Sequence, residues 1–158
     1  MTEKETIKDG VVETFHKNGQ LESRTNYRDG KQDSFWERFY ENGQVEIRRH
    51  FNKNGERDGL WESYYENGQL KETRTHKNGK PDGLWERFRQ NGQLRNRTNY
   101  KNGKQDGLHE IFYRNGKLEY RENYINGKID GLRETFYFTS NNNPFVLHGQ
   151  IRTRENYK

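Results

Sequence analysis

The stretch DGLWERFRQNGQLRNRTNYKNGKQ, residues 82–105, decides the fold because it recurs along the chain. Successive copies begin 24 or 25 residues apart, which is a period typical of repeat proteins whose copies pack mainly on their neighbours. The one longer interval is explained by Asn52, which we interpret as an insertion next to a turn. The six copies begin at Asp9, Asp33, Asp58, Asp82, Asp106 and Asp130.

Each copy contains two short segments rich in aromatic and β-branched residues, and turns separate them. The first turn carries an Asn-Gly pair in five copies: Asn18-Gly19, Asn42-Gly43, Asn67-Gly68, Asn91-Gly92 and Asn115-Gly116. Between strand-like segments this pair predicts a two-residue hairpin of type I′, in which both residues have a positive φ. The second turn, KNGKPDG at residues 77–83, reads as a longer one. The sequence therefore predicts an all-β fold, an elongated antiparallel meander of tandem β-hairpins with about twelve strands and no helix.

A two-residue Asn-Gly loop also predicts which residues face each other across the hairpin. Counting outward from Asn91-Gly92 places Glu86 opposite Arg97. Opposite charges in such positions stabilise an antiparallel pair by a few tenths of a kcal/mol when exposed. We therefore interpret these glutamates as structural rather than catalytic. The same count gives three further pairs: Glu13 with Arg24, Glu37 with Arg48, and Glu110 with Arg121.

The third copy is the exception, because there the count places Glu62 opposite Thr73. The alternative is a three-residue loop followed by a bulge. In that case Leu70 would lie beside Tyr64, and the glutamate–arginine pairing is expected to be lost.

The sixth copy departs from the pattern after Phe138, where TSNNNPFVL, residues 139–147, replaces the expected turn. The last copy of a stacked array needs protection of its edge, so this insertion is expected either to cap the array or to dock a partner. We divide the chain into a lead-in, residues 1–8, and a single repeat domain, residues 9–158.

The composition excludes a thick central core. Only 27% of the residues are hydrophobic and the mean hydropathy is -1.54, yet aromatic residues reach 14%. The net charge of +5 comes from 29 basic and 24 acidic residues that are interleaved along the chain, which is typical of a solvated surface. This mild excess leaves weak binding of anionic lipid or nucleic acid open as an alternative.

No residue pattern points to catalysis or to a cofactor. The chain has no cysteine, and no pair among its five histidines has the spacing of metal ligands. Four of the five are interpreted as replacements at aromatic positions of the repeat. The first residues lack the apolar segment of a signal peptide, and no apolar run is long enough to cross a bilayer. We therefore expect a soluble, intracellular protein without catalytic, cofactor or metal sites.

The segment GLWESYYENGQL, residues 59–70, followed by Arg74 and by KNGK at residues 77–80, resembles the MORN repeat variant, the divergent class of membrane occupation and recognition nexus repeats. The resemblance covers about residues 9–158. It implies an extended β-hairpin array that binds proteins and has no enzymatic activity. Similar repeats occur in bacterial proteins described as antitoxin or immunity components, and in large DNA viruses.

The expected function is thus a non-catalytic protein-binding or scaffolding module, either antitoxin- or immunity-like or a viral structural component. Its partner would be a protein, and a homo-oligomer through the sheet edges is a further expectation. The alternative is peripheral binding of anionic lipid or nucleic acid through basic and aromatic strand faces. The candidate partner-binding residues are Trp36, Tyr40, Trp61, Tyr65, Trp85, His109, Tyr113, Phe145, Val146 and Leu147.

Overall fold

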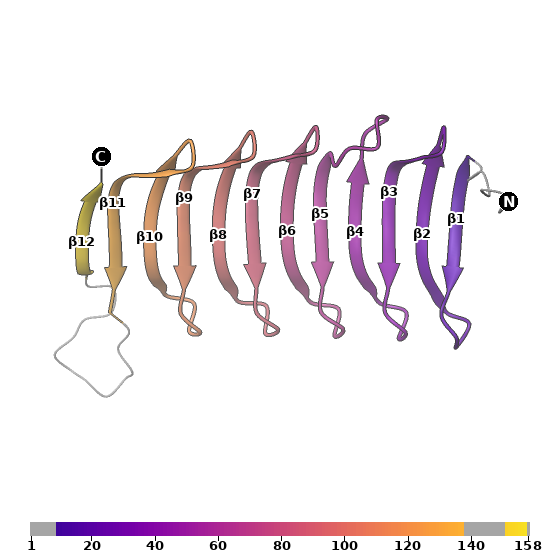
Figure 1. The fold of residues 1–158 in the computed structure, drawn as a ribbon. Coiled ribbons are helices and arrows are strands. Elements are labelled where there is room, and N and C mark those ends of the chain that lie inside the picture. The colour runs from indigo at the N-terminus through magenta and orange to yellow at the C-terminus, as the bar shows by residue number, and fades with distance from the viewer. Residues whose placement is uncertain (1–8, 138–150, 158) are drawn as a thin grey trace, which may run out of the picture. The chain divides into compact units, whose positions relative to one another are not determined.

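The computed structural model describes residues 9–137 and 151–157. It divides into two compact units, Met1–Lys80 and Pro81–Lys158, and each is considered by itself. In each unit the strands follow one another in chain order in a single layer, and each is antiparallel to the one before (Figure 1).

The two units contain twelve strands among the described residues, and no helix. The predicted all-β meander is therefore confirmed. The first unit holds β1 (Gly10–Phe15), β2 (Leu21–Arg28), β3 (Lys31–Phe39), β4 (Val45–Phe51), β5 (Gly59–Tyr64) and β6 (Leu70–Lys77). The second holds β7 (Lys80–Phe88), β8 (Leu94–Lys101), β9 (Lys104–Phe112), β10 (Leu118–Ile125), β11 (Lys128–Phe136) and β12 (Ile151–Tyr157).

The first Asn-Gly turn of each copy is a three-residue loop. In the third copy the N–H of Tyr65 donates to the carbonyl of Gln69 at 2.8 Å, and the N–H of Gly68 donates to the carbonyl of Tyr65 at 2.8 Å. Only Gly68 has a positive φ, 79°, whereas Asn67 does not. This is a type I turn closed by a glycine bulge, so the type I′ prediction for this turn was wrong. Asn-Gly suits both geometries, because each needs glycine at the position with the left-handed backbone.

Both registers considered from the sequence hold in part. Leu70 does lie opposite Tyr64, as the three-residue loop requires. A second bulge directly after this pair, which leaves Lys71 unpaired, then shifts the register by one residue and brings Glu62 opposite Thr73. The bulge thus compensates for the extra loop residue, and the predicted pairing survives.

The type I′ turn is found at the second turn of the copy, where the sequence suggested a longer loop. Asn102 and Gly103 have φ values of 51° and 87°, and the flanking Lys101 and Lys104 pair directly. Asp29-Gly30, Asn78-Gly79 and Asn126-Gly127 have the same pair of positive φ angles. In each unit the first turns of the copies lie at one end of the strands and the second turns at the other (Figure 1).

Asn52 lies in the β4–β5 turn, as expected for an inserted residue. Its N–H donates to the carbonyl of Glu56 at 2.9 Å, and the N–H of Gly55 donates to its carbonyl at 2.9 Å. These are the bonds of the three-residue loop. The insertion therefore converts a type I′ turn into a type I turn closed by a glycine bulge. The side-chain oxygen of Asn52 also accepts the N–H groups of Asn54 and Glu56.

The residue after the leading Asp of each copy has a left-handed backbone. The φ is 89° at Gly59, 102° at Gly107 and 82° at Gly131. In the second copy Ser34 stands at this position with a φ of 64°. A side chain with a Cβ is strained there, so the second copy is expected to be less stable than a glycine-containing one.

Candidate binding surfaces

Strand alternation gives each unit two chemically different faces. The tryptophan face carries Trp36, Arg49, Trp61 and Arg74 in the first unit, and Trp85, Thr98, His109, Glu122 and Arg133 in the second. The glutamate face carries Glu13, Arg24, Glu37, Arg48 and Glu62 in the first unit, and Glu86, Arg97, Glu110, Arg121, Glu134 and Arg154 in the second. With a single layer of strands, neither face is covered by a second sheet or helix among the described residues.

On the glutamate face all five predicted pairs lie opposite each other, including Glu62 with Thr73. In the first unit Arg48 pairs with Glu37 of its own hairpin at 2.8 Å, and it also lies 3.8 Å from Glu62 of the next copy. In the second unit the ion pairs join successive copies, because Arg97 pairs with Glu110 and Arg121 pairs with Glu134 at 2.6 Å. The charges therefore connect copies as well as strands of one hairpin.

Glu134 lies between two arginines and is almost inaccessible, with 2% of its surface exposed. Hydrogen bonds from Arg121 and then from Arg154 hold the pKa of its carboxyl below the ordinary value. Both arginines remain partly exposed, so solvent screens part of this attraction. The glutamate is a structural anion and not an acid poised for catalysis.

A row of exposed aliphatic side chains runs beside these charges. The residue two positions before the glutamate of the copy is Val11 in the first copy and leucine in the third to sixth, and alternation places it on the glutamate face. The exposed fraction ranges from 37% at Leu84 to 55% at Val11. We call Val11 and Leu60 in the first unit, and Leu84, Leu108 and Leu132 in the second, the leucine row.

The leucine row was not selected from the sequence, which drew attention to aromatic residues. The signal was available, since the leucine follows the glycine of every DGL motif and sits on the face opposite the tryptophan. The exposure of these leucines to solvent could not be predicted from the sequence. Trp61 is the one hydrophobic residue classed as buried among the described residues, whereas the leucines stay open to solvent.

On the tryptophan face of the first unit, Trp61 is surrounded by cations and rings. The guanidinium carbons of Arg49 and Arg57 lie 4.6 Å and 4.4 Å from its ring centroid. The rings of His76 and Phe51 are 4.7 Å and 5.9 Å away. Arg49 also lies 4.6 Å from the ring of Trp36, so its guanidinium contacts both tryptophans.

The arginines of this face differ in their partners. Arg38 is 2.6 Å from Glu46 and Arg74 is 2.8 Å from Glu72. Arg49 has no carboxylate partner in the described part of the chain. Burial, followed by the charges of Arg57, Arg38 and Arg74, lowers the pKa of its guanidinium.

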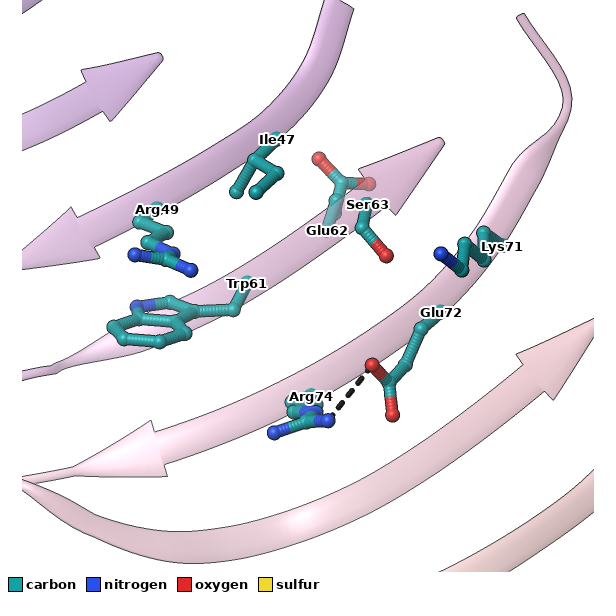
Figure 2. Close-up of a pocket in the computed structure, with 8 residues that line it drawn as sticks. All are labelled: Ile47, Arg49, Trp61, Glu62, Ser63, Lys71, Glu72 and Arg74. Carbon is teal, nitrogen blue, oxygen red and sulfur yellow. Dashed lines mark hydrogen bonds and ion pairs between the residues drawn. The ribbon is translucent and has the colours of Figure 1, made fainter. Parts of the chain in front are cut away.

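A hollow of about 230 Å³ opens beside Trp61. Figure 2 shows Arg49 on β4 and Arg74 on β6 on either side of Trp61, with Ser63 and Glu62 further along β5. The full lining consists of Ile47, Arg49, Trp61, Glu62, Ser63, Lys71, Glu72 and Arg74.

In the second unit the same face satisfies its own charges. Arg133, which occupies the tryptophan position, is 3.1 Å from Glu122 and donates to the hydroxyl groups of Tyr120 and Tyr157 at 3.0 Å and 3.2 Å. Burial, with a hydrogen bond to Glu122, raises the pKa of Tyr120 to about 12. A hollow of about 570 Å³ lies next to Tyr120 and Tyr113, and Arg152 also lines it.

The predicted partner-binding residues fall into three groups. Trp36 and Trp61 in the first unit, and Trp85 and His109 in the second, lie on the tryptophan face. Tyr40, Tyr65 and Tyr113 begin the three-residue loops instead. Phe145, Val146 and Leu147, with the proposed cap at residues 139–147, lie outside the described residues.

The loop residues connect successive copies. The hydroxyl groups of Tyr40 and Tyr113 donate to the carbonyls of Tyr64 and Phe136, both at 2.8 Å. His16 stands at the same position and its Nε2 lies 2.9 Å from the carbonyl of Phe39. At the same end, the amides of Asn18 and Asn42 donate to the carbonyls of Glu41 and Glu66, both at 3.0 Å. These contacts reach from one copy to the following one.

At the opposite end of the strands the contacts lie within a copy. The N–H groups of Asn102 and Asn126 donate to the carboxylates of Asp82 and Asp106, which begin the same copies, at 3.0 Å and 3.1 Å. The leading Asp of the repeat therefore holds the type I′ turn of its own copy. It has a structural role and is not a catalytic carboxylate.

The model of one family, described as the MORN repeat variant, matches five segments: residues 8–29, 36–53, 57–78, 81–102 and 105–126. The chain belongs to the MORN repeat variant family. Each match overlaps one of the first five predicted copies. The sixth copy, which begins at Asp130, is not matched. MORN repeats generally form non-catalytic binding or scaffolding modules that contact proteins or membranes.

Solved structures that resemble the MORN array do so only distantly. One is of the accessory secretory proteins 1, 2 and 3 of Streptococcus pneumoniae, with 15% identity and a TM-score of 0.38 over 66% of this chain and 19% of that one. Another is a mutant of S. aureus TarM in complex with Fondaparinux, alpha-GlcNAc-glycerol and UDP, with 10% identity and a TM-score of 0.35 over 77% of this chain and 21% of that one. The chain thus spans about a fifth of the length of each. A comparison with curated proteins finds no match.

Among the described residues, no group of three or more His, Asp or Glu side chains is arranged to hold a metal ion. No helix in the described part has the length and apolar character needed to cross a membrane.

Proposed function

We propose that this MORN array is a non-catalytic scaffold whose protein partner docks on the leucine row. The observation that supports this most is the recurrence of an exposed aliphatic side chain at one repeat position, as at Leu84, Leu108 and Leu132. Exposed apolar side chains that recur on one surface and are bordered by polar residues are typical of protein-binding sites. The rim here is the row of glutamates and arginines, which gives the apolar row a charged border.

The biological role we propose is neutralisation or assembly inside a cell or a virion. In the first case the partner is a toxin-like enzyme and the array is an antitoxin- or immunity-like factor. In the second case the partner is a viral structural protein. The tryptophan-face residues Trp36, Trp61, Trp85 and His109 remain part of the proposed binding surface.

Affinity capture from the native source tests the proposal, with a matched pair of variants. The double variant Leu108→Ser with Leu132→Ser removes two members of the leucine row. The control, Ile125→Ser, removes an equally exposed aliphatic residue at a turn outside the row. A partner protein should be retained by the wild type and by the control, and lost from the double variant.

The identity of the captured protein then separates the roles. A toxin-like enzyme supports neutralisation, and an internal or capsid protein of a virion supports assembly. A partner retained equally by all three proteins contradicts docking on the leucine row.

One observation favours a second candidate, peripheral binding of anionic lipid or nucleic acid. Arg49 and Arg57 contact Trp61 without a carboxylate partner among the described residues, which is a combination of charge and ring that phosphates and bases can use. Retention on anionic liposomes or oligonucleotides that falls steeply as salt rises would favour this candidate. Unchanged low retention at low salt contradicts it.

A further inference from the structure

We propose that the hollow beside Trp61 binds a carboxylate side chain from an acidic segment of the partner protein. This inference deepens the proposed function, because it assigns the chemistry of part of the partner. It concerns the tryptophan face of the first unit, whereas the leucine row lies on the glutamate face.

An excess of positive charge surrounds the guanidinium of Arg49. Burial lowers its pKa, and the charges of Arg57, Arg38 and Arg74 lower it further. Arg38 and Arg74 each have a glutamate within 2.8 Å, but Arg49 and Arg57 have none in the described residues. A half-buried cation without an anion is unfavourable, and an incoming carboxylate would relieve it.

The repeat does not require arginine at the positions of Arg49 and Arg74. Arg49 lies opposite Trp36, and Arg74 lies opposite Trp61. Thr98 occupies the equivalent position opposite Trp85, and Glu122 occupies it opposite His109. Copies therefore fold with a neutral or an acidic residue there, so the paired arginines are a local addition to the fold.

A carboxylate suits the hollow better than a phosphate. Glu72 lines the same hollow as Arg49, so a doubly charged phosphate would be repelled by the carboxylate of Glu72 more strongly than a singly charged group. A singly charged carboxylate suits the planar guanidinium of Arg49, which can donate two parallel hydrogen bonds to it. The ring of Trp61 offers apolar contact to the methylene groups that carry a glutamate or aspartate carboxylate.

The position of Arg49 prepares it for such a partner. Its guanidinium is held 4.6 Å from the rings of both Trp36 and Trp61, so its orientation is restricted before the ligand arrives. A restricted guanidinium loses less conformational freedom on binding than a free one. The site thus has a fixed donor, an apolar floor and no competing carboxylate on that donor.

The test uses the full chain and blocked synthetic peptides, and follows tryptophan fluorescence and binding heat. One peptide alternates Glu and Gly, the second replaces each Glu by Gln, and inorganic phosphate and phosphatidylserine vesicles serve as separate probes. The Glu peptide should bind with an affinity that decreases with salt, and the Gln peptide should bind at least about tenfold more weakly.

Three variants localise the binding. Arg49→Gln should weaken the Glu peptide about tenfold, and Arg49→Lys should weaken it less, because it retains the charge but loses the planar pair of donors. Lys53→Gln, which removes one exposed charge in the neighbouring turn, should change the affinity less than about twofold. The circular dichroism of each variant at 25 °C confirms that it is folded before binding is measured.

The inference is overturned if the Gln peptide binds as well as the Glu peptide, or if folded Arg49→Gln binds like the wild type. It is also overturned if phosphate or the vesicles bind more tightly than the Glu peptide through Arg49, because the site then recognises phosphate. The leucine-row double variant should bind the Glu peptide normally. A wild-type chain that captures its partner through the leucine row but does not bind the Glu peptide would therefore contradict this inference alone.

Discussion

The guanidinium of Arg121 pairs with the carboxylate of Glu134 in the next copy, with 2.6 Å between Nε and Oε2. The register places Arg121 between two glutamates, Glu110 on β9 and Glu134 on β11. Arg97 has the same choice between Glu86 and Glu110, and it also pairs with the glutamate of the following copy. In the second unit the charges of the glutamate face therefore link copies.

A double-mutant cycle should show that Arg121 is coupled to the glutamate of the following copy. We expect Arg121→Gln and Glu134→Gln to show a coupling energy of about 0.5 to 1.5 kcal/mol in urea unfolding. Arg121→Gln with Glu110→Gln should show a clearly smaller coupling, because Glu110 pairs with Arg97. Equal couplings in the two cycles would contradict the assigned ion pair.

The same residue predicts a pH dependence. The pKa of Glu134 is lower in the folded chain than its ordinary value of 4.5, so its contribution to stability is present above that value and is lost as pH falls through the folded pKa. The stability difference between wild type and Glu134→Gln should therefore shrink as pH is lowered from 6 to about 3. A difference that is constant over this range would show that the charge of Glu134 is not involved.

Ser34→Gly should stabilise the first unit by about 0.5 to 1 kcal/mol, because the φ of 64° is strained for serine and free for glycine. The loss of a 3.2 Å hydrogen bond from Asn26 to the serine hydroxyl reduces the gain. Thermal unfolding measures the effect. The matched control is Ser63→Gly on β5, where φ is not positive, and it should be destabilising.

Tyr113→Phe should destabilise the second unit by about 1 kcal/mol, since it leaves the carbonyl of Phe136 without the hydroxyl that donates at 2.8 Å. Tyr100→Phe is the control, because that ring stacks on Trp85 with 4.3 Å between centroids and its hydroxyl has no hydrogen bond in the described residues. Chemical unfolding compares the two. If Tyr100→Phe costs as much as Tyr113→Phe, the contact between copies is not the cause.

His76→Tyr should reduce the loss of stability in mild acid. Burial, with the charges of Arg57 and Arg74, lowers the pKa of His76 in the folded chain below its ordinary value of 6.5. The unfolded chain therefore binds the proton better, and stability falls as pH decreases from about 6.5 toward the folded pKa. The unfolding midpoint should drop less between pH 7.5 and 5.5 in the variant. The substitution places at position 76 the residue type that the next copy has at the equivalent position, Tyr100. An equal drop in both proteins would exclude His76 as a contributor.

The sequence predicted the strands and the facing pairs, because period and alternation are recorded directly in the residue types. It assigned the turn types to the wrong turns. Asn67-Gly68 and Asn102-Gly103 are the same dipeptide, yet only Asn102 has a positive φ. A bulge at Lys71 follows the first turn, whereas Lys101 and Lys104 pair directly beside Asn102-Gly103. This difference belongs to strand pairing and is not encoded by the dipeptide itself.

The candidate site was predicted less completely. Aromatic positions pointed to Trp61, but Trp61 is buried and Tyr113 is engaged in joining copies. The importance of Arg49 could not be read from the sequence, where it is one of many basic residues. Only the arrangement in space shows that its neighbours are tryptophans and other cations.

The contacts between copies also bear on how such a chain can evolve. Each copy presents the same donors forward, as Asn18 and Asn42 do, and its second turn donates back to the carbonyl that ends the preceding copy, as Gly103 and Gly127 do to Pro81 and Gln105. A duplication or deletion of one coding repeat therefore leaves two ends that still fit. Selection can adjust the length of the array by whole copies, with one more or one fewer exposed leucine each time, without inventing a new interface.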